Sequence, residues 1–94
     1  MTQVVERVQT GVRLDKRTLK VLKALAEYLD LSLGDLLEGI VLHAFEGKAP
    51  FSFETRAQIE RLRGVYALTL TAADSRLLQE ADAAGGDDEA WTGT

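Results

Sequence analysis

The chain has no cysteine among its 94 residues, which excludes disulfides, thiolate metal sites and cysteine nucleophiles together. Proline occurs once and glycine eight times, while 46% of the residues are apolar, a composition typical of a helical globular protein. No apolar run approaches the roughly 18 residues of a membrane helix, and "MTQVVERVQTGV" has no run of signal-peptide type. These absences predict one small, soluble, cytoplasmic domain with an appendage.

Groups able to support catalysis or metal binding are equally scarce. The one histidine, His43, has no cysteine or second histidine with which to share a metal ion. Ser32, Ser52 and Ser75 stand at or near predicted helix starts, where capping explains them, and "AAGGDD" is no phosphate-binding loop. We therefore expect no enzyme activity, no catalytic residue, no metal and no cofactor.

Positive charge is in the minority, with a net charge of -4, but it is concentrated at one end of the sequence. Between Arg7 and Lys23 there are six basic residues and one acidic residue, a local balance of +5. From Ala49 to Thr94 four basic residues face eight acidic ones, a local balance of -4. The front of the chain is therefore suited to a phosphate partner and the rear to a protein partner.

The stretch "VQTGVRLDKRTLKVL" changes its periodicity in the middle. Up to Leu14, every second position is expected to face the protein interior, and this alternation predicts a strand over residues 8–14. After Asp15, an expected N-cap, apolar residues recur every three or four positions, which predicts a helix over residues 16–29.

Further helices are predicted after the first. Ser32 and Asp35 form a capping-box pattern before a second helix of about 14 residues, which Gly47 and Pro50 terminate. Its apolar face is wide enough to pack against two neighbours. A third helix is expected over residues 53–67 after Ser52, and a fourth over residues 72–83.

These elements divide the chain into three parts. We expect a strand-helix-helix domain over residues 1–48, a helical extension over residues 49–84 and an acidic flexible tail over residues 85–94. Within the tail, Trp91 is a candidate for docking a partner, because a lone tryptophan among acidic residues is costly to expose.

A single strand cannot satisfy its own backbone hydrogen bonds, so the predicted strand requires a mate in a second copy of the chain. Antiparallel pairing about a two-fold axis would place Arg7, Gln9, Gly11 and Arg13 on the solvent face of a two-stranded ribbon. Arginine pairs bidentately with guanine and glutamine with adenine, so such a ribbon is suited to the major groove of DNA.

The order of these elements resembles the ribbon-helix-helix family of Arc, MetJ and CopG type regulators. The resemblance rests on "GVRLDKRTLKVLKALAEYLDLSLGDLLEGIVLHAF" and covers about residues 7–47. It implies a mainly α fold, in which an N-terminal strand pairs with a second chain and is followed by two helices, with two additional C-terminal helices here.

The resemblance also implies roles for individual residues. Base contacts are expected from Gln9, Gly11 and Arg13, and phosphate contacts from Arg7, Lys16, Arg17, Ser32 and Leu33. Gly11 leaves a gap in the base-reading face, and Asp35 would repel a phosphate at the start of the second helix. The expected dimer interface consists of Val8, Thr10, Val12, Leu14, Leu36, Ile40, Val41 and Phe45.

The leading functional hypothesis is a homodimeric, sequence-specific DNA-binding regulator, a repressor, whose partners are a double-stranded DNA operator and further copies of itself. One alternative is an antitoxin-like regulator whose C-terminal half binds a toxin protein. A second alternative is a dimerisation module in a protein assembly that never binds DNA. The acidity of the chain, Gly11 and Asp35 favour this last alternative, and the basic cluster from Arg7 to Lys23 opposes it.

Overall fold

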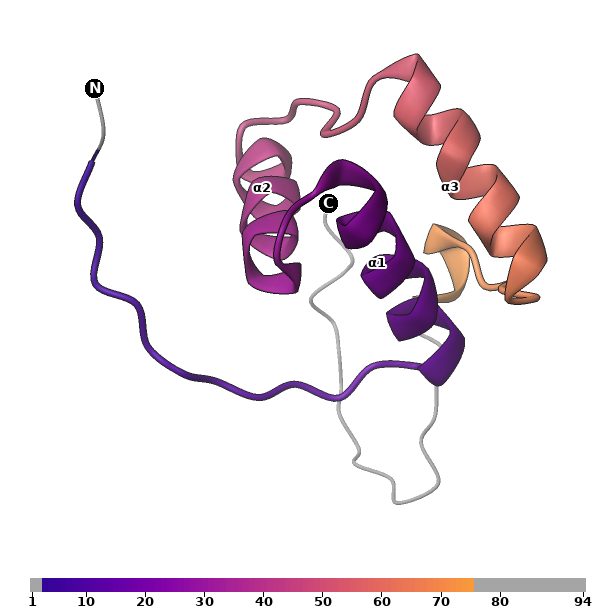
Figure 1. Cartoon of the computed structure of the whole chain (residues 1–94), viewed down its shortest axis with the longest axis horizontal. Coiled ribbons are helices and arrows are strands. Elements are labelled where there is room, and N and C mark those ends of the chain that lie inside the picture. Colours follow the sequence, from indigo (N-terminus) through magenta and orange to yellow (C-terminus); the bar gives the residue numbers. More distant parts are fainter. Residues whose placement is uncertain (1–2, 76–94) are drawn as a thin grey trace.

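The structure is a computed structural model that describes residues 3–75. Three α-helices, α1 (Lys16–Leu29), α2 (Leu33–Phe45) and α3 (Phe53–Val65), are followed by a short 3-10 helix, η1 (Ala72–Asp74). Helix α1 lies between α2 and α3 and packs against both of them (Figure 1). None of the described helices is long and apolar enough to cross a membrane.

Each α-helix begins at a side-chain oxygen that accepts a hydrogen bond from a backbone N–H in the first turn. Asp15 caps α1, Ser32 caps α2 and Ser52 caps α3, over distances of 3.0, 3.0 and 3.2 Å. The N–H groups of a first turn lack partners within the helix, and these caps satisfy one of them each time. The three predicted N-caps are confirmed.

The helices also end in a common way, through a residue in the left-handed conformation. Asp30, Gly47 and Ala67 have φ values of 61°, 71° and 55°. In each case the next residue donates its N–H to a carbonyl five positions earlier, which satisfies a carbonyl of the last turn. Gly47 ends α2 as predicted, whereas Ala67 adopts the conformation despite its Cβ, at a cost of roughly 1–2 kcal/mol.

The core is small and centred on α1. Leu25 and Ala26 of α1 and Leu36 of α2 are buried in one cluster, and Leu25 is only 2% exposed. Partly buried apolar side chains from all three helices and the α2–α3 connection surround this cluster: Leu22, Leu29, Ile40, Phe51, Ile59 and Leu62. The apolar stripe predicted for residues 16–29 therefore packs as expected.

The predicted N-terminal strand, and with it the ribbon-helix-helix fold class, is wrong for this structure, whose described residues contain three helices and no strand. Residues 3–14 run away from α1 as an exposed, irregular segment (Figure 1). In the single chain no described segment forms backbone hydrogen bonds with them. A strand exists only through such a ladder, so alternating residues alone did not suffice.

The predicted fourth helix is also corrected where the structure describes it. In place of a helix that begins at Ala72 and continues, the chain forms the three-residue η1 and a turn at Ser75. The expected capping box is present, since Thr71 N–H donates to the Asp74 carboxylate at 2.9 Å. The remainder of that predicted helix, the predicted tail and Trp91 lie outside the described residues.

Candidate nucleic-acid interface

The residues expected to read bases lie in the exposed segment before α1, which we call the arm (residues 3–14). Gln9, Gly11 and Arg13 are all exposed there. A Cβ placed on Gly11 would meet nothing within 4 Å, so the gap that this glycine leaves is open space. The arm therefore presents its polar side chains without the geometry that a paired ribbon would impose.

Arg7, an expected phosphate contact, is held by the start of α2. Its Nη1 donates to the Glu38 carboxylate at 2.7 Å, and its Nη2 lies 3.7 Å from the Asp35 carboxylate. The hydrogen bond from Arg7 to Glu38 and the charge of Glu38 raise the pKa of the guanidinium above its ordinary value. Both partners are exposed, so this network is a weak tether that a phosphate can compete for.

Two basic side chains of α1 contact the segment that follows α3. Arg17 donates from Nη1 to the Ala67 carbonyl at 3.0 Å, and its Nε lies 3.9 Å from the Asp15 carboxylate. The Lys20 ammonium lies 5.9 Å from the centre of the Tyr66 ring, within cation–π range. Sequence reasoning missed both contacts, because nothing local connects residues about fifty positions apart.

The start of α2, expected to hold a phosphate, is occupied by the chain's own groups. The Ser32 hydroxyl accepts from the Asp35 N–H, and Leu33 is half-buried at the first helical position. The Asp35 and Glu38 carboxylates sit in the first turns, where they oppose the approach of another anion. Lys16, another expected phosphate contact, is exposed in the first turn of α1 and forms no ion pair with the residues that the structure describes.

The expected dimer-interface residues fall into two groups. Leu36 is buried in the core of the single chain, and Ile40 is half-buried against it. The others are exposed: Val8, Thr10, Val12 and Leu14 on the arm, and Val41 and Phe45 on α2. Phe45 is 80% exposed, an unusual position for a large aromatic side chain.

Sequence reasoning also missed Leu42, which is 59% exposed beside Val41 and Phe45 on α2. We call Val41, Leu42 and Phe45 the α2 apolar face. The spacing from Leu42 to Phe45 is three residues, which places both side chains on one side of a helix and was the available signal. The face continues the surface that was expected to find a second neighbour.

Comparison with known proteins adds nothing to this description, since no family model, curated protein or solved structure matches the chain. The resemblance to ribbon-helix-helix regulators stays a prediction drawn from about residues 7–47.

Proposed function

We propose that the chain is a homodimeric, sequence-specific DNA-binding regulator that represses transcription in the cytoplasm, and that its extended arm contacts the DNA. The observation that carries this proposal is the arm itself, which is exposed along its whole described length and leads directly into the basic start of α1. Extended basic arms are an established means of contacting DNA beside a helical domain.

The charge distribution supports a phosphate partner at this end of the molecule. Arg13 of the arm and Lys16 and Lys23 of α1 are exposed, within the stretch whose local balance is +5. Arg7 would exchange the Glu38 carboxylate for a phosphate oxygen, so that its ion pair in the free chain is replaced and not lost. Each such contact releases counterions from DNA, which makes binding sensitive to salt.

The exposed apolar surface supports the homodimer. The α2 apolar face and the arm's Val8 and Val12 place large apolar side chains in solvent in the single chain. Val41, Leu42 and Phe45 are neighbours on one helix, and exposed apolar surface of that kind marks interaction sites. A second copy related by a two-fold axis would cover both α2 faces with each other, which a single isologous interface achieves.

The first experiment measures binding of the purified protein to DNA from the region upstream of its own gene and to random DNA of equal length, across a salt series. We expect preferential binding to the upstream DNA, with an affinity that falls steeply as salt rises. Arg13→Ala should reduce this preference about tenfold or more, since a specific base contact contributes about 1–3 kcal/mol.

Arg61→Ala is the matched control. Arg61 lies on α3, is exposed and donates to the Gln58 side chain, so its removal changes the net charge equally while leaving the arm intact. Equal binding to both DNAs at low salt would refute the proposal. So would equal losses for the Arg13 and Arg61 variants, because the arm would then contribute only its charge.

The second candidate function is a dimerisation module that never binds DNA. The specific observation that favours it is the acidic start of α2, where Asp35 and Glu38 already neutralise Arg7. A stable dimer in solution that shows no salt-dependent DNA binding would select this alternative.

A further inference from the structure

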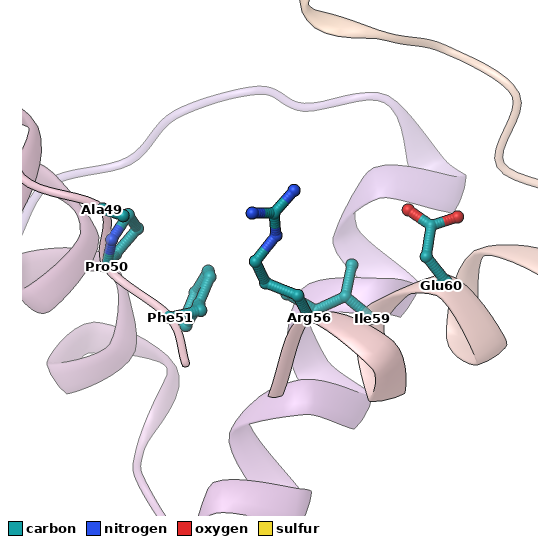
Figure 2. A pocket seen from close by; sticks show the side chains of 6 residues that line it. All are labelled: Ala49, Pro50, Phe51, Arg56, Ile59 and Glu60. Carbon is teal, nitrogen blue, oxygen red and sulfur yellow. The ribbon is translucent and has the colours of Figure 1, made fainter. Parts of the chain in front are cut away.

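A hollow of about 200 Å³ opens between the α2–α3 connection and the first half of α3. Figure 2 shows Pro50 and Phe51 at one end, Ile59 further along and Glu60 beyond it at the other end. The Arg56 side chain stands between Phe51 and Ile59. The hollow therefore combines an apolar lining from the connection and α3 with one cation.

Arg56 is notable because its side chain makes no ion pair or hydrogen bond with the described residues, in contrast to Arg61 and Arg63 on the same helix. The carboxylate at the far end, Glu60, lies 3.9 Å from Arg63 Nε. A guanidinium beside apolar walls, without a partner among residues 3–75, suits a ligand with a carboxylate next to a large apolar side chain.

We propose that the hollow docks residues 87–91 of the same chain, "DDEAW", with Trp91 against Phe51 and Ile59 and the acidic residues near Arg56. This segment carries three carboxylates and the only tryptophan of the chain. The occupant and the hollow are therefore complementary in charge and in apolar character. Aromatic side chains seated in such positions supply much of the energy of an interface.

The length of the chain permits this arrangement. Fifteen residues separate Ser75, the last described residue, from Trp91, and they can span up to about 50 Å when extended. The longest dimension of the molecule is 42 Å. Because the segment is tethered, its effective concentration at the hollow is high, which favours docking within one chain over docking between chains.

The competing position for an acidic segment is the basic surface of α1, where Lys16 and Lys23 are exposed. That surface offers charge, but Lys20 already lies over the Tyr66 ring, whereas the hollow at Arg56 combines one cation with apolar walls from Phe51 and Ile59. A tryptophan gains most where apolar walls surround it, which favours the hollow at Arg56.

The test uses the fluorescence of Trp91 in the full chain, since no other tryptophan contributes. We expect blue-shifted emission and weak quenching by acrylamide in the parent protein. Arg56→Glu should raise the quenching constant to at least half that of the urea-unfolded chain, while Arg61→Glu and Lys23→Glu should leave it near the parent value. Circular dichroism of each variant establishes that the helices persist.

Four outcomes would overturn the proposal. Parent emission equal to that of the unfolded chain would mean that the indole docks nowhere. A protected indole that Arg56→Glu leaves protected would place it elsewhere, and loss of protection in Lys23→Glu alone would assign it to α1. Protection that disappears on dilution would replace docking within one chain by docking between chains. DNA takes no part in this test, so its result is independent of the proposed function.

Discussion

Helices α1 and α2 differ in a way that their compositions alone would not suggest. α1 carries the larger share of charged residues, yet Val21, Leu25 and Ala26 are buried because α2 and α3 cover it from two sides. α2 is the more apolar helix, yet only Leu36 is buried, because α1 is the only described helix that packs against it. Burial in this molecule follows the number of neighbours and not the number of apolar residues.

This difference in burial indicates separate roles for the two helices. The apolar side chains of α1 match the neighbours that the chain itself supplies, so α1 stabilises the single chain. α2 carries more apolar side chains than its described neighbours cover, and Val41, Leu42 and Phe45 remain exposed. Surface of this kind is costly in water unless a partner removes it, so α2 is the helix through which a second copy is expected to bind.

Replacing a leucine by alanine should lower the free energy of unfolding strongly in α1 and only slightly in α2, and this is the largest difference that we expect. Leu25→Ala removes a side chain that is 2% exposed, and should lower the free energy of unfolding by about 2–5 kcal/mol. Leu42→Ala, the matched control on α2, should cost less than about 0.5 kcal/mol in dilute protein. Urea titration followed by circular dichroism measures both.

The difference in cost between the two leucine substitutions should depend on protein concentration. If a dimer covers Leu42, its truncation should cost more at high protein concentration, whereas the cost of Leu25→Ala should change little. Similar costs for the two leucines in dilute protein would contradict the difference in burial between α1 and α2.

A charge on the α2 apolar face should separate self-association from folding. If the proposed dimer forms through this face, Phe45→Asp should convert it to a folded monomer, because an unpaired carboxylate would be buried at the interface. Phe53→Asp makes the same change at a phenylalanine on α3 that is also highly exposed, and should leave the dimer intact. Sedimentation measurements give the mass of each variant, and an undiminished Phe45→Asp dimer would move the interface away from α2.

The same contrast shows what the sequence could predict. The bounds of α1 and the caps Asp15, Ser32 and Ser52 follow from local signals, because a helix satisfies its hydrogen bonds within a few residues. The strand over residues 8–14 failed because a strand depends on a segment elsewhere. The contacts of Arg7 with Glu38 and of Arg17 with Ala67 could not be predicted either, since they join positions 31 and 50 residues apart.

Removing the Ser32 cap should destabilise α2 while leaving α1 unaffected. Ser32→Ala leaves the Asp35 N–H without its acceptor and should cost about 1 kcal/mol. Because Leu36 is the one buried residue of α2, the loss should appear as faster amide exchange along α2 while α1 keeps its protection. Ser32→Asp supplies another capping oxygen and should restore slow amide exchange. If Ser32→Ala accelerated amide exchange equally in both helices, the expected difference between α1 and α2 would be contradicted.

Acid should produce the smallest effect, and at the helix starts it should act through the cap of α1. The hydrogen bond from the Thr18 N–H is the main reason that the pKa of Asp15 lies below its ordinary value of 3.8. A carboxyl whose pKa is lower in the folded than in the unfolded state stabilises the fold above the unfolded pKa, and this contribution is lost as pH falls through the folded pKa. The start of α1 should therefore loosen only below about pH 4, while the Ser32 hydroxyl that caps α2 does not titrate in this range.

Asp15→Ser would give α1 the same kind of cap as α2 and should abolish the loosening. The amide resonance of Thr18 during an acid titration measures this effect. If that resonance moves equally in the parent and in Asp15→Ser, the acid sensitivity belongs to another carboxyl and the two helix starts do not differ in this respect.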